Sequence, residues 1–284
     1  MKLLLHPQVE QQIEKFVEHA PHAILITGKA GSGKRSLAYY AAARVLGVDP
    51  DAIERYPHIT LVEPVDGSIS IDAVRSLQHT LSLKNGSSNA QRVAIVLDGH
   101  TLGEEAQNAL LKTLEEPPAG AVIIITAAGA SNLLPTVRSR MQELAVTTPG
   151  SADLQKHFAA LGHSTETIQR AGRLSGGLPG LMHALLTGDD SHPLYVATAQ
   201  ARDLLSKDTY QRLLLVDSLA KNKQACLDLC FVLGQMADIS LQTPKPLAAQ
   251  QSWRRVLTAS YEASSQLATN AGPKLIMTNL MLSL

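Results

Sequence analysis

Hydrophobic and polar residues follow two different patterns along this chain. Up to about residue 148, short apolar runs alternate with segments in which apolar residues recur every three or four positions. Such runs are typical of buried strands, and the wider spacing is typical of helices. Because helical segments separate the runs, the pattern predicts an α/β fold with a five-stranded, doubly wound parallel sheet. The predicted strands are Ala23–Thr27, Ile59–Pro64, Val93–Asp98, Val122–Thr126 and Glu143–Val146.

Helices are predicted between these strands. One spans Lys34–Leu46, and a second begins at Ile71, with Val74, Leu77 and Leu81 on the same face. A third lies between the third and fourth strands and ends at a pair of prolines, which cannot continue a helix.

After Pro149 the strand pattern disappears. Three short segments broken by glycines predict three helices, and longer helical segments follow from Pro193 to the end. The stretch Leu241–Gln250 predicts an exposed loop. The chain therefore divides into three predicted parts: residues 1–148, residues 149–190 and residues 191–284.

Composition narrows the class of protein. Hydrophobic residues make up 45% of the chain, while Lys plus Arg and Asp plus Glu both total 25. This balance argues against a chain that grips nucleic acid by bulk charge. Two cysteines form no disulfide framework and fit a reducing compartment. The N-terminal apolar run is too short for a signal peptide, and we find no bilayer-spanning stretch, so we expect a soluble cytoplasmic protein.

The glycine-rich stretch after the first predicted strand predicts a phosphate site. Gly28 to Lys34 complete the pattern G-x-x-x-x-G-K between a strand and a helix, where backbone amides and the lysine hold phosphates. The alternative is a glycine-rich surface turn. The candidate nucleotide-binding residues are Gly28, Gly31, Ser32, Gly33, Lys34, Arg35 and Ser36.

The magnesium site predicted beside such a loop is degraded. Arg35 stands where a Ser or Thr would bind Mg²⁺. Asp98, followed by Gly99, is a single acid at the end of its strand, where an ATPase of this kind has a pair. Thr101 and Glu104 have the spacing of a capping box. We interpret the acids of the following helix as surface charges: Glu104, Glu105, Glu115 and Glu116.

One long stretch resembles a known family. The segment NALLKTLEEPP, Asn108 to Pro118, is similar to the AAA+ clamp-loader proteins of bacterial replication. The match extends from the phosphate loop to LLPTVRSR, which ends at Arg140, and covers about half of the chain. The resemblance implies an AAA+ domain, a small helical lid over residues 149–190 and an all-α collar, used for oligomerisation, over residues 191–284.

The resemblance also assigns roles to single residues. Aligned on NALLK, Leu97 falls at the metal-binding Asp of the family and Asp98 at its catalytic Glu; with a one-residue gap, Asp98 falls at the first and Gly99 at the second. Thr126 falls at the sensor 1 position, and Gly180 replaces the sensor 2 arginine. The zinc-binding cysteines of the family are absent, so we expect no zinc and no other metal site.

The motif RSRM retains an arginine of the family. Arg140 falls at the arginine finger, which stabilises charge on a nucleotide bound to the neighbouring subunit, and Met141 replaces a cysteine. The alternative is a surface arginine at a helix end or a salt-bridge partner. Arg138, two residues before it, is interpreted as a supporting charge only.

These substitutions imply a stator: a subunit that helps to load a sliding clamp onto primed DNA, supplies an arginine finger and has no ATPase activity of its own. Its partners would be motor subunits of gamma or tau type, a delta-like subunit, the clamp and the primed DNA. ATP, ADP or no nucleotide fills its loop; the sequence leaves this open. The alternatives are an ATP-hydrolysing motor subunit of the same loader and a P-loop small-molecule kinase.

Other residues with candidate chemistry have simpler interpretations. Cys226 and Cys230 lie four residues apart on a predicted helix, without further ligands, which favours core packing. His100 is close to Asp98, and a structural role is favoured. Trp253, followed by two arginines, is interpreted as an anchor beside solvated charges, with a surface that faces a partner or DNA as the alternative.

Overall fold

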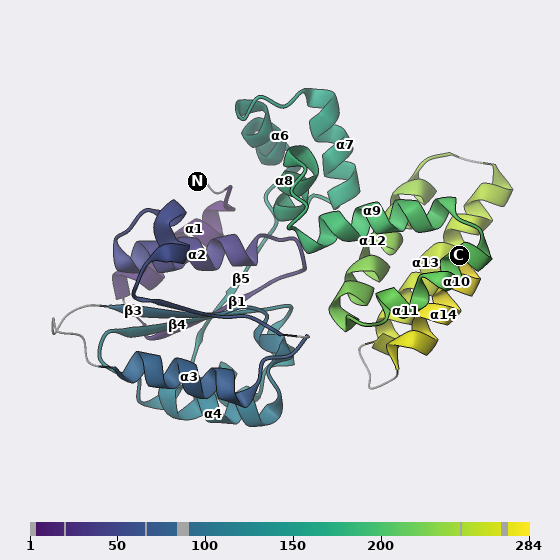
Figure 1. Ribbon diagram of the computed structural model, residues 1–284. Coiled ribbons are helices and arrows are strands. Elements are labelled where there is room, and N and C mark those ends of the chain that lie inside the picture. The colour runs from purple at the N-terminus through teal and green to yellow at the C-terminus, as the bar shows by residue number, and fades with distance from the viewer. Residues whose placement is uncertain (1–3, 20, 66, 84–90, 245, 268–271) are drawn as a thin grey trace. The chain divides into compact units, whose positions relative to one another are not determined.

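The computed structural model describes residues 4–19, 21–65, 67–83, 91–244, 246–267 and 272–284. It divides into two compact units, Met1–Pro149 and Gly150–Leu284 (Figure 1). All five strands belong to the first unit, and the described part of the second unit is helical. The predicted boundary after residue 148 lies beside this division, and the predicted boundary after residue 190 stays a prediction.

The first unit is built on one parallel sheet, with strand order β2-β3-β4-β1-β5. This confirms the predicted α/β fold with five parallel strands. Every residue of β1 and β4 is buried, which explains why both stand out in the sequence as unbroken apolar runs. The bounds are β1 Ala23–Thr27, β2 Ile59–Val62, β3 Arg92–Val96, β4 Ala121–Ala127 and β5 Gln142–Ala145.

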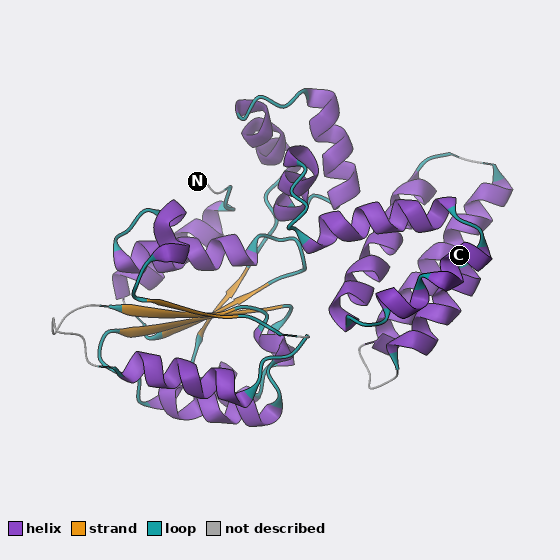
Figure 2. Ribbon diagram, in the orientation of Figure 1, coloured by secondary structure: helices purple, strands orange, loops and turns teal. Residues whose placement is uncertain are grey.

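Helices cover both faces of the sheet (Figure 2). Helices α1 (Pro7–His19) and α2 (Lys34–Leu46) pack on one face, and α3 (Ile71–Ser82) and α4 (Glu104–Glu115) on the other. Successive residues of β3 alternate between the two cores: Ile95 packs on the α2 side and Val96 on the α4 side. The central strands β1, β3 and β4 are therefore buried on both faces.

Short elements complete this unit: the 3₁₀ helices η1 (Pro50–Arg55), η2 (Gly99–Thr101) and η3 (Ala130–Asn132), and helix α5 (Pro135–Arg138). The predicted capping box of Thr101 and Glu104 is wrong. Gly103 caps α4 without a side-chain hydrogen bond. The Thr101 hydroxyl instead donates to the carbonyl oxygen of Asp98 at 2.8 Å, because Thr101 belongs to the turn of η2.

The second unit is made of helices, including the three short ones predicted after Pro149. Within the longer helical segments predicted after Pro193, the helix is interrupted at Leu215. The predicted loop Leu241–Gln250 is mostly helical, since α12 and α13 extend into it; Lys245 lies outside the described residues. The bounds are α6 Ser151–Ala160, α7 Thr165–Ser175, α8 Pro179–Thr187, α9 Pro193–Ser206, α10 Thr209–Leu214, α11 Val216–Leu219, α12 Lys223–Gln242, α13 Leu247–Leu267 and α14 Pro273–Ser283.

Helix α12 is the central helix of this unit. It packs against α9 and α13, and it buries Cys226 and Cys230, as predicted for core residues. Burial raises the pKa of both thiols, that of Cys230 to about 12, so both are protonated at neutral pH. By length and composition alone α12 is long enough to cross a bilayer, which corrects the expectation that no stretch is. Its packing is that of a core helix.

Candidate functional site

The predicted phosphate loop lies at the carboxyl edge of the sheet. Strand β1 ends at Thr27, between β4 and β5, and residues 28–33 lead from it to the first turn of α2. In open parallel sheets, ligands bind outside the carboxyl ends of the strands. The N-terminus of α2 adds unpaired amides and the positive end of the helix dipole. The local structure is therefore that of an anion site.

Three glycines give the loop its shape. Gly31 and Gly33 have φ angles of 74° and 88°, which side chains with a β-carbon rarely adopt. At Gly28 a β-carbon would lie 2.9 Å from the Ser32 hydroxyl oxygen and 3.2 Å from Cβ of Val146. All three positions require glycine, so a bulkier residue would open the loop.

Lys34 closes the loop from inside. Its Nζ donates to the carbonyl oxygens of Gly28 at 2.7 Å and Lys29 at 2.8 Å. Burial lowers the pKa of this ammonium, and the Asp98 carboxylate partly opposes that shift. The hydroxyl of Ser32 is buried and has no hydrogen-bond partner among the described residues. Together the ammonium and the unpaired hydroxyl are donors that fit a phosphate group.

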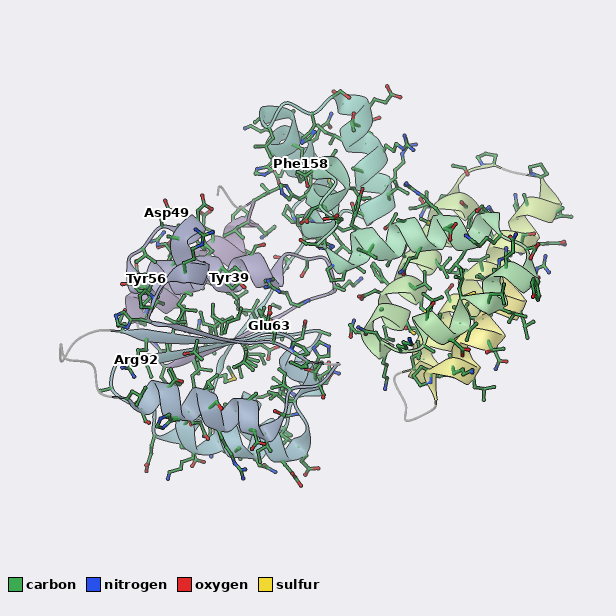
Figure 3. The ribbon with its side chains drawn as sticks, viewed as in Figure 1. Tyr39, Asp49, Tyr56, Glu63, Arg92 and Phe158 are labelled. Carbon is green, nitrogen blue, oxygen red and sulfur yellow. The ribbon has the colours of Figure 1, made fainter. Side chains whose placement is uncertain are left out.

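The contacts of Arg35 do not suit a metal-binding role. Its Nη1 pairs with Oε1 of Glu63 at 2.6 Å, and its guanidinium carbon lies 5.5 Å from the ring centroid of Tyr39. Figure 3 labels both neighbours. A guanidinium cannot ligate a cation, and here it also neutralises a carboxylate near the loop. These residues therefore do not fit a magnesium ion held in the usual way. The replacement of a metal-binding Ser or Thr by Arg35 was visible in the sequence, whereas its partner Glu63 was not.

A single acid lies at the end of β3. Leu97 is buried in the core on the α2 side, whereas Asp98 is half-buried and adopts a left-handed conformation with φ 50°. The backbone amide of Asp98 donates to the Thr126 hydroxyl at 2.9 Å. Thr126 is 1% exposed and lies on β4, so it holds the turn that carries Asp98. Whether Thr126 also senses nucleotide stays a prediction.

His100 lies in the same neighbourhood. Its Nδ1 is buried without a hydrogen-bond partner in the described part of the chain. Burial lowers the pKa of this imidazole; Asp98 raises it and Lys34 lowers it further. A neutral imidazole is the favoured form, since burial disfavours its charged form.

Arg140 lies in the short segment between α5 and β5. Its Nη2 pairs with Oε1 of Glu115 at 2.6 Å, and its Nη1 donates to the carbonyl oxygen of Thr136 at 2.8 Å. The side chain is 34% exposed. The salt-bridge interpretation is thus correct for this structure, and it leaves the finger role as a prediction. Arg138 lies 3.8 Å from Glu143, at the outer limit of an ion pair.

Helix α4 holds this arginine segment at two points. Gln107 is buried; its amide nitrogen donates to the carbonyl oxygen of Leu102 at 3.0 Å, and its amide oxygen accepts from the backbone amide of Leu134 at 2.7 Å. Glu115, two turns further on, pairs with Arg140. Sequence reasoning missed Gln107; its only signal was a polar residue on the buried face of an amphipathic helix.

The described residues contain no group of three or more His, Cys, Asp and Glu that could hold a metal ion. Gly180 lies in the first turn of α8 and is half-buried, and its assignment to the sensor 2 position stays a prediction. Ser36, also half-buried, lies within α2 and directly follows Arg35.

Comparison with known proteins gives consistent results. The sequence model of the family described as DNA polymerase III, delta subunit, matches residues 5–149. The chain is 31% identical over 186 residues to DNA polymerase III subunit delta′ of Pseudomonas aeruginosa, covering 59% of this chain and 56% of that protein. It is 28% identical over 204 residues to the delta′ subunit of Escherichia coli, covering 66% of this chain and 61% of that protein. The matches thus span less than two thirds of the length of these relatives.

Solved structures share the fold. A DNA polymerase III gamma subunit-related protein from Thermotoga maritima has a TM-score of 0.52 at 20% identity, over 97% of each chain. A RuvB variant from the same organism has a TM-score of 0.50 at 17% identity, over 96% of this chain and 87% of that one. At these identities the likeness concerns the fold alone.

Proposed function

This chain belongs to the family of DNA polymerase III delta subunits, whose sequence model covers residues 5–149, and we propose that it is a stator of delta-prime type in a bacterial clamp loader. In this role it helps to load a ring-shaped sliding clamp onto primed DNA. It hydrolyses no ATP itself and assists the ATPase subunit next to it.

One contrast carries the proposal. The residues that would handle a metal ion in the chain's own site are replaced, since Arg35 is paired with Glu63 and Leu97 is buried in the core. Arg140, which would act on a neighbour, is present and partly exposed, and its side chain is paired with Glu115 of α4. A subunit that only assists catalysis needs the second feature and not the first.

Arg140 would act across the subunit interface. Its guanidinium carries a permanent positive charge and five N–H donors, which suit the oxygens of a γ-phosphate. Glu115 orients the side chain and competes with that phosphate for it. In known cases an arginine finger contributes about 10³–10⁵ in rate. We propose that the ion pair with Glu115 breaks, or is shared, when the neighbour binds its nucleotide.

The chain's own loop would bind ATP or ADP through phosphate contacts. Lys34, the unpaired hydroxyl of Ser32 and the amides at the start of α2 supply donors for two adjacent phosphates. Because the residues do not fit a magnesium ion, we derive no hydrolytic step in this chain. Bound nucleotide would stabilise the loop rather than supply energy.

The remainder of the proposal concerns assembly. Residues 149–190 would act as a lid and residues 191–284 as the collar that binds motor subunits of gamma or tau type and a delta-like subunit. The clamp and the primed DNA would be reached through the complex, and the protein would act in the cytoplasm.

Reconstitution of the loader with Arg140→Ala tests this function. ATP turnover, stimulated by clamp and primed DNA, should fall by at least the share of the one site next to this chain, because that site loses its finger. Size-exclusion chromatography should show that the variant still assembles.

Arg138→Ala is the matched control, since it removes an arginine two residues away that has only a distant ion pair. Its turnover should stay well above that of Arg140→Ala, because Arg138 is only a supporting charge. If the Arg140→Ala loader turns over ATP as fast as the unmodified loader, the finger assignment is contradicted. Turnover by the isolated chain, abolished by Lys34→Ala, would favour the motor-subunit alternative.

A further inference from the structure

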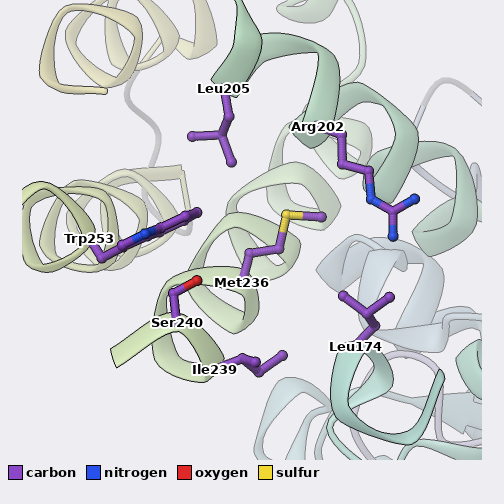
Figure 4. Close-up of a pocket in the computed structure, with 7 residues that line it drawn as sticks. All are labelled: Leu174, Arg202, Leu205, Met236, Ile239, Ser240 and Trp253. Carbon is purple, nitrogen blue, oxygen red and sulfur yellow. The ribbon is translucent and has the colours of Figure 1, made fainter. Parts of the chain in front are cut away.

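A hollow lies within the helical unit, between α7, α9, α12 and α13. It has a volume of about 310 Å³, and Figure 4 shows its lining side chains pointing inward from these helices. Five of them are apolar and half-buried, so the floor of the hollow remains open to solvent: Leu174, Leu205, Met236, Ile239 and Trp253. A hollow of this size accommodates one or two large side chains.

A second hollow of about 550 Å³ adjoins the first. The two share Leu174, Arg202 and Ile239, so they form one continuous groove, which we call the α7–α12 groove. Its outer part is lined by polar side chains of α7, among them Glu166 and Arg173. The groove therefore has an apolar end and a polar end.

The polar end is positively charged. Arg170, Arg173 and Arg202 line it against the single carboxylate of Glu166. All three arginines are exposed, and in the described ranges none of them forms an ion pair or a side-chain hydrogen bond. In a chain whose acidic and basic residues balance, this local excess of positive charge is unusual.

The walls of the groove are fixed by close packing. Helix α7 is capped by Gly176, whose φ is 61°, and a β-carbon there would lie 3.0 Å from Oε1 of Gln235 on α12. The α7 end thus lies directly on α12. Leu229 and Leu233 of α12 are fully buried beneath. The groove is a formed feature of the unit, and a ligand would not have to create it.

We propose that the α7–α12 groove binds a peptide segment of another protein, in which one or two large apolar side chains are adjacent to aspartate or glutamate residues. The apolar side chains would fill the hollow beside Met236 and Trp253, as anchor residues do at protein interfaces. The carboxylates would pair with the unpaired guanidiniums, which bind carboxylates through two parallel hydrogen bonds. Met236 adapts to different apolar anchors, because its side chain is flexible.

The lining favours a peptide over a strand of nucleic acid. Single-stranded nucleic acid binds by stacking its bases on aromatic rings. The apolar end has one aromatic side chain, Trp253, and four that are aliphatic or thioether, which suit side chains better than bases. This inference does not depend on the proposed stator function.

Selection from a random peptide library tests the proposal. A phage library of peptides of about a dozen residues is selected on the full chain, and enriched sequences are synthesised with a fluorescent label. We expect them to combine acidic and large apolar residues. By fluorescence anisotropy, Arg202→Glu should weaken their binding at least about tenfold, because it reverses a charge that pairs with the peptide.

Arg254→Glu is the matched control, since Arg254 is exposed on α13 beside Trp253 and does not line the groove. It should leave peptide binding unchanged, and thermal unfolding should show both variants folded. The proposal is overturned if no sequence is enriched, if the enriched peptides lack acidic residues, or if Arg202→Glu binds them as tightly as the unmodified chain. Saturable binding of a single-stranded oligothymidylate that Arg202→Glu abolishes would also overturn it and identify a nucleic-acid surface.

Discussion

At the scale of single residues, the loop is shaped by what surrounds it. The Arg35 guanidinium forms an ion pair with Glu63 and lies over the ring of Tyr39. The Lys34 ammonium donates hydrogen bonds to the carbonyl oxygens of Gly28 and Lys29. An exposed pair such as Arg35–Glu63 contributes only about 0–1 kcal/mol to stability, so it matters for the charge it places there rather than for folding. The site thus has donors for phosphate, and the residues that the structure describes contain no group of three or more His, Cys, Asp and Glu that could hold a cation.

Nucleotide binding should therefore need no magnesium. A fluorescent ADP analogue is titrated into the isolated chain with and without EDTA. The chelator should change the affinity by less than about threefold, because the phosphates are bound by protein donors and not through a metal ion. Lys34→Ala should weaken binding at least about tenfold, since it removes a charged donor to the phosphates. Lys29→Ala serves as the control, because it removes a lysine side chain of the same loop and keeps the backbone carbonyl that accepts from Lys34. A requirement for magnesium would contradict this picture.

Stability should depend on His100 between about pH 7 and pH 5. Burial lowers the pKa of His100 in the folded protein below the ordinary value of 6.5, so the unfolded chain binds its proton more readily. The free energy of unfolding should therefore fall as the pH drops below 6.5, and His100→Gln should make that fall shallower. Urea unfolding at several pH values measures this effect.

The control for one lost histidine is His79→Gln, on the exposed surface of α3. Its pH dependence should match that of the unmodified protein. An identical slope in the His100→Gln variant would show that the imidazole contributes nothing to acid destabilisation.

At the scale of elements, the turn from β3 to α4 places Asp98 by tight packing. Gly99 is buried, and a β-carbon there would lie 2.4 Å from Cγ2 of Ile125 on β4. Thr126, the next residue of β4, accepts the amide of Asp98. Strand β4 therefore fixes the position of the acid from two neighbouring residues.

Gly99→Ala should destabilise the first unit by about 1–3 kcal/mol, because the added methyl group overpacks the core against β4. Gly103→Ala is a matched control: it lies four residues away, at the start of α4, with no atom within 4 Å of the added carbon. Its cost should stay below about 1 kcal/mol. Denaturant unfolding of both variants measures the difference, and equal costs would contradict the packing argument.

The sequence predicts the elements better than their contacts. The central strands β1 and β4 are recovered because every residue is buried and they read as apolar runs, and α2 begins and ends as predicted because glycines flank it. The capping box failed because Thr101 has a closer acceptor in its own turn. The partners Glu63, Gln107 and Glu115 could not be predicted, since each meets its partner only once the sheet and helices have formed. The phosphate loop, in contrast, is local and was visible from spacing alone.

At the scale of the whole molecule, our proposal assigns a different function to each of the two units. The first, Met1–Pro149, carries the loop and the arginine, and it corresponds to the region matched by the family model. The second, Gly150–Leu284, has a central helix α12 and the α7–α12 groove, and would mediate assembly. The balanced net charge of the chain fits a subunit that reaches DNA through a complex rather than alone.

The central claim is that this chain lends an arginine to a neighbour and does not use its own loop for hydrolysis. The most direct measurement compares Lys34→Ala and Arg140→Ala in the same reconstituted loader, by steady-state ATP turnover with clamp and primed DNA present. We predict that Lys34→Ala leaves turnover nearly unchanged and that Arg140→Ala lowers it. The reverse result, with turnover lost in Lys34→Ala and kept in Arg140→Ala, would contradict the account.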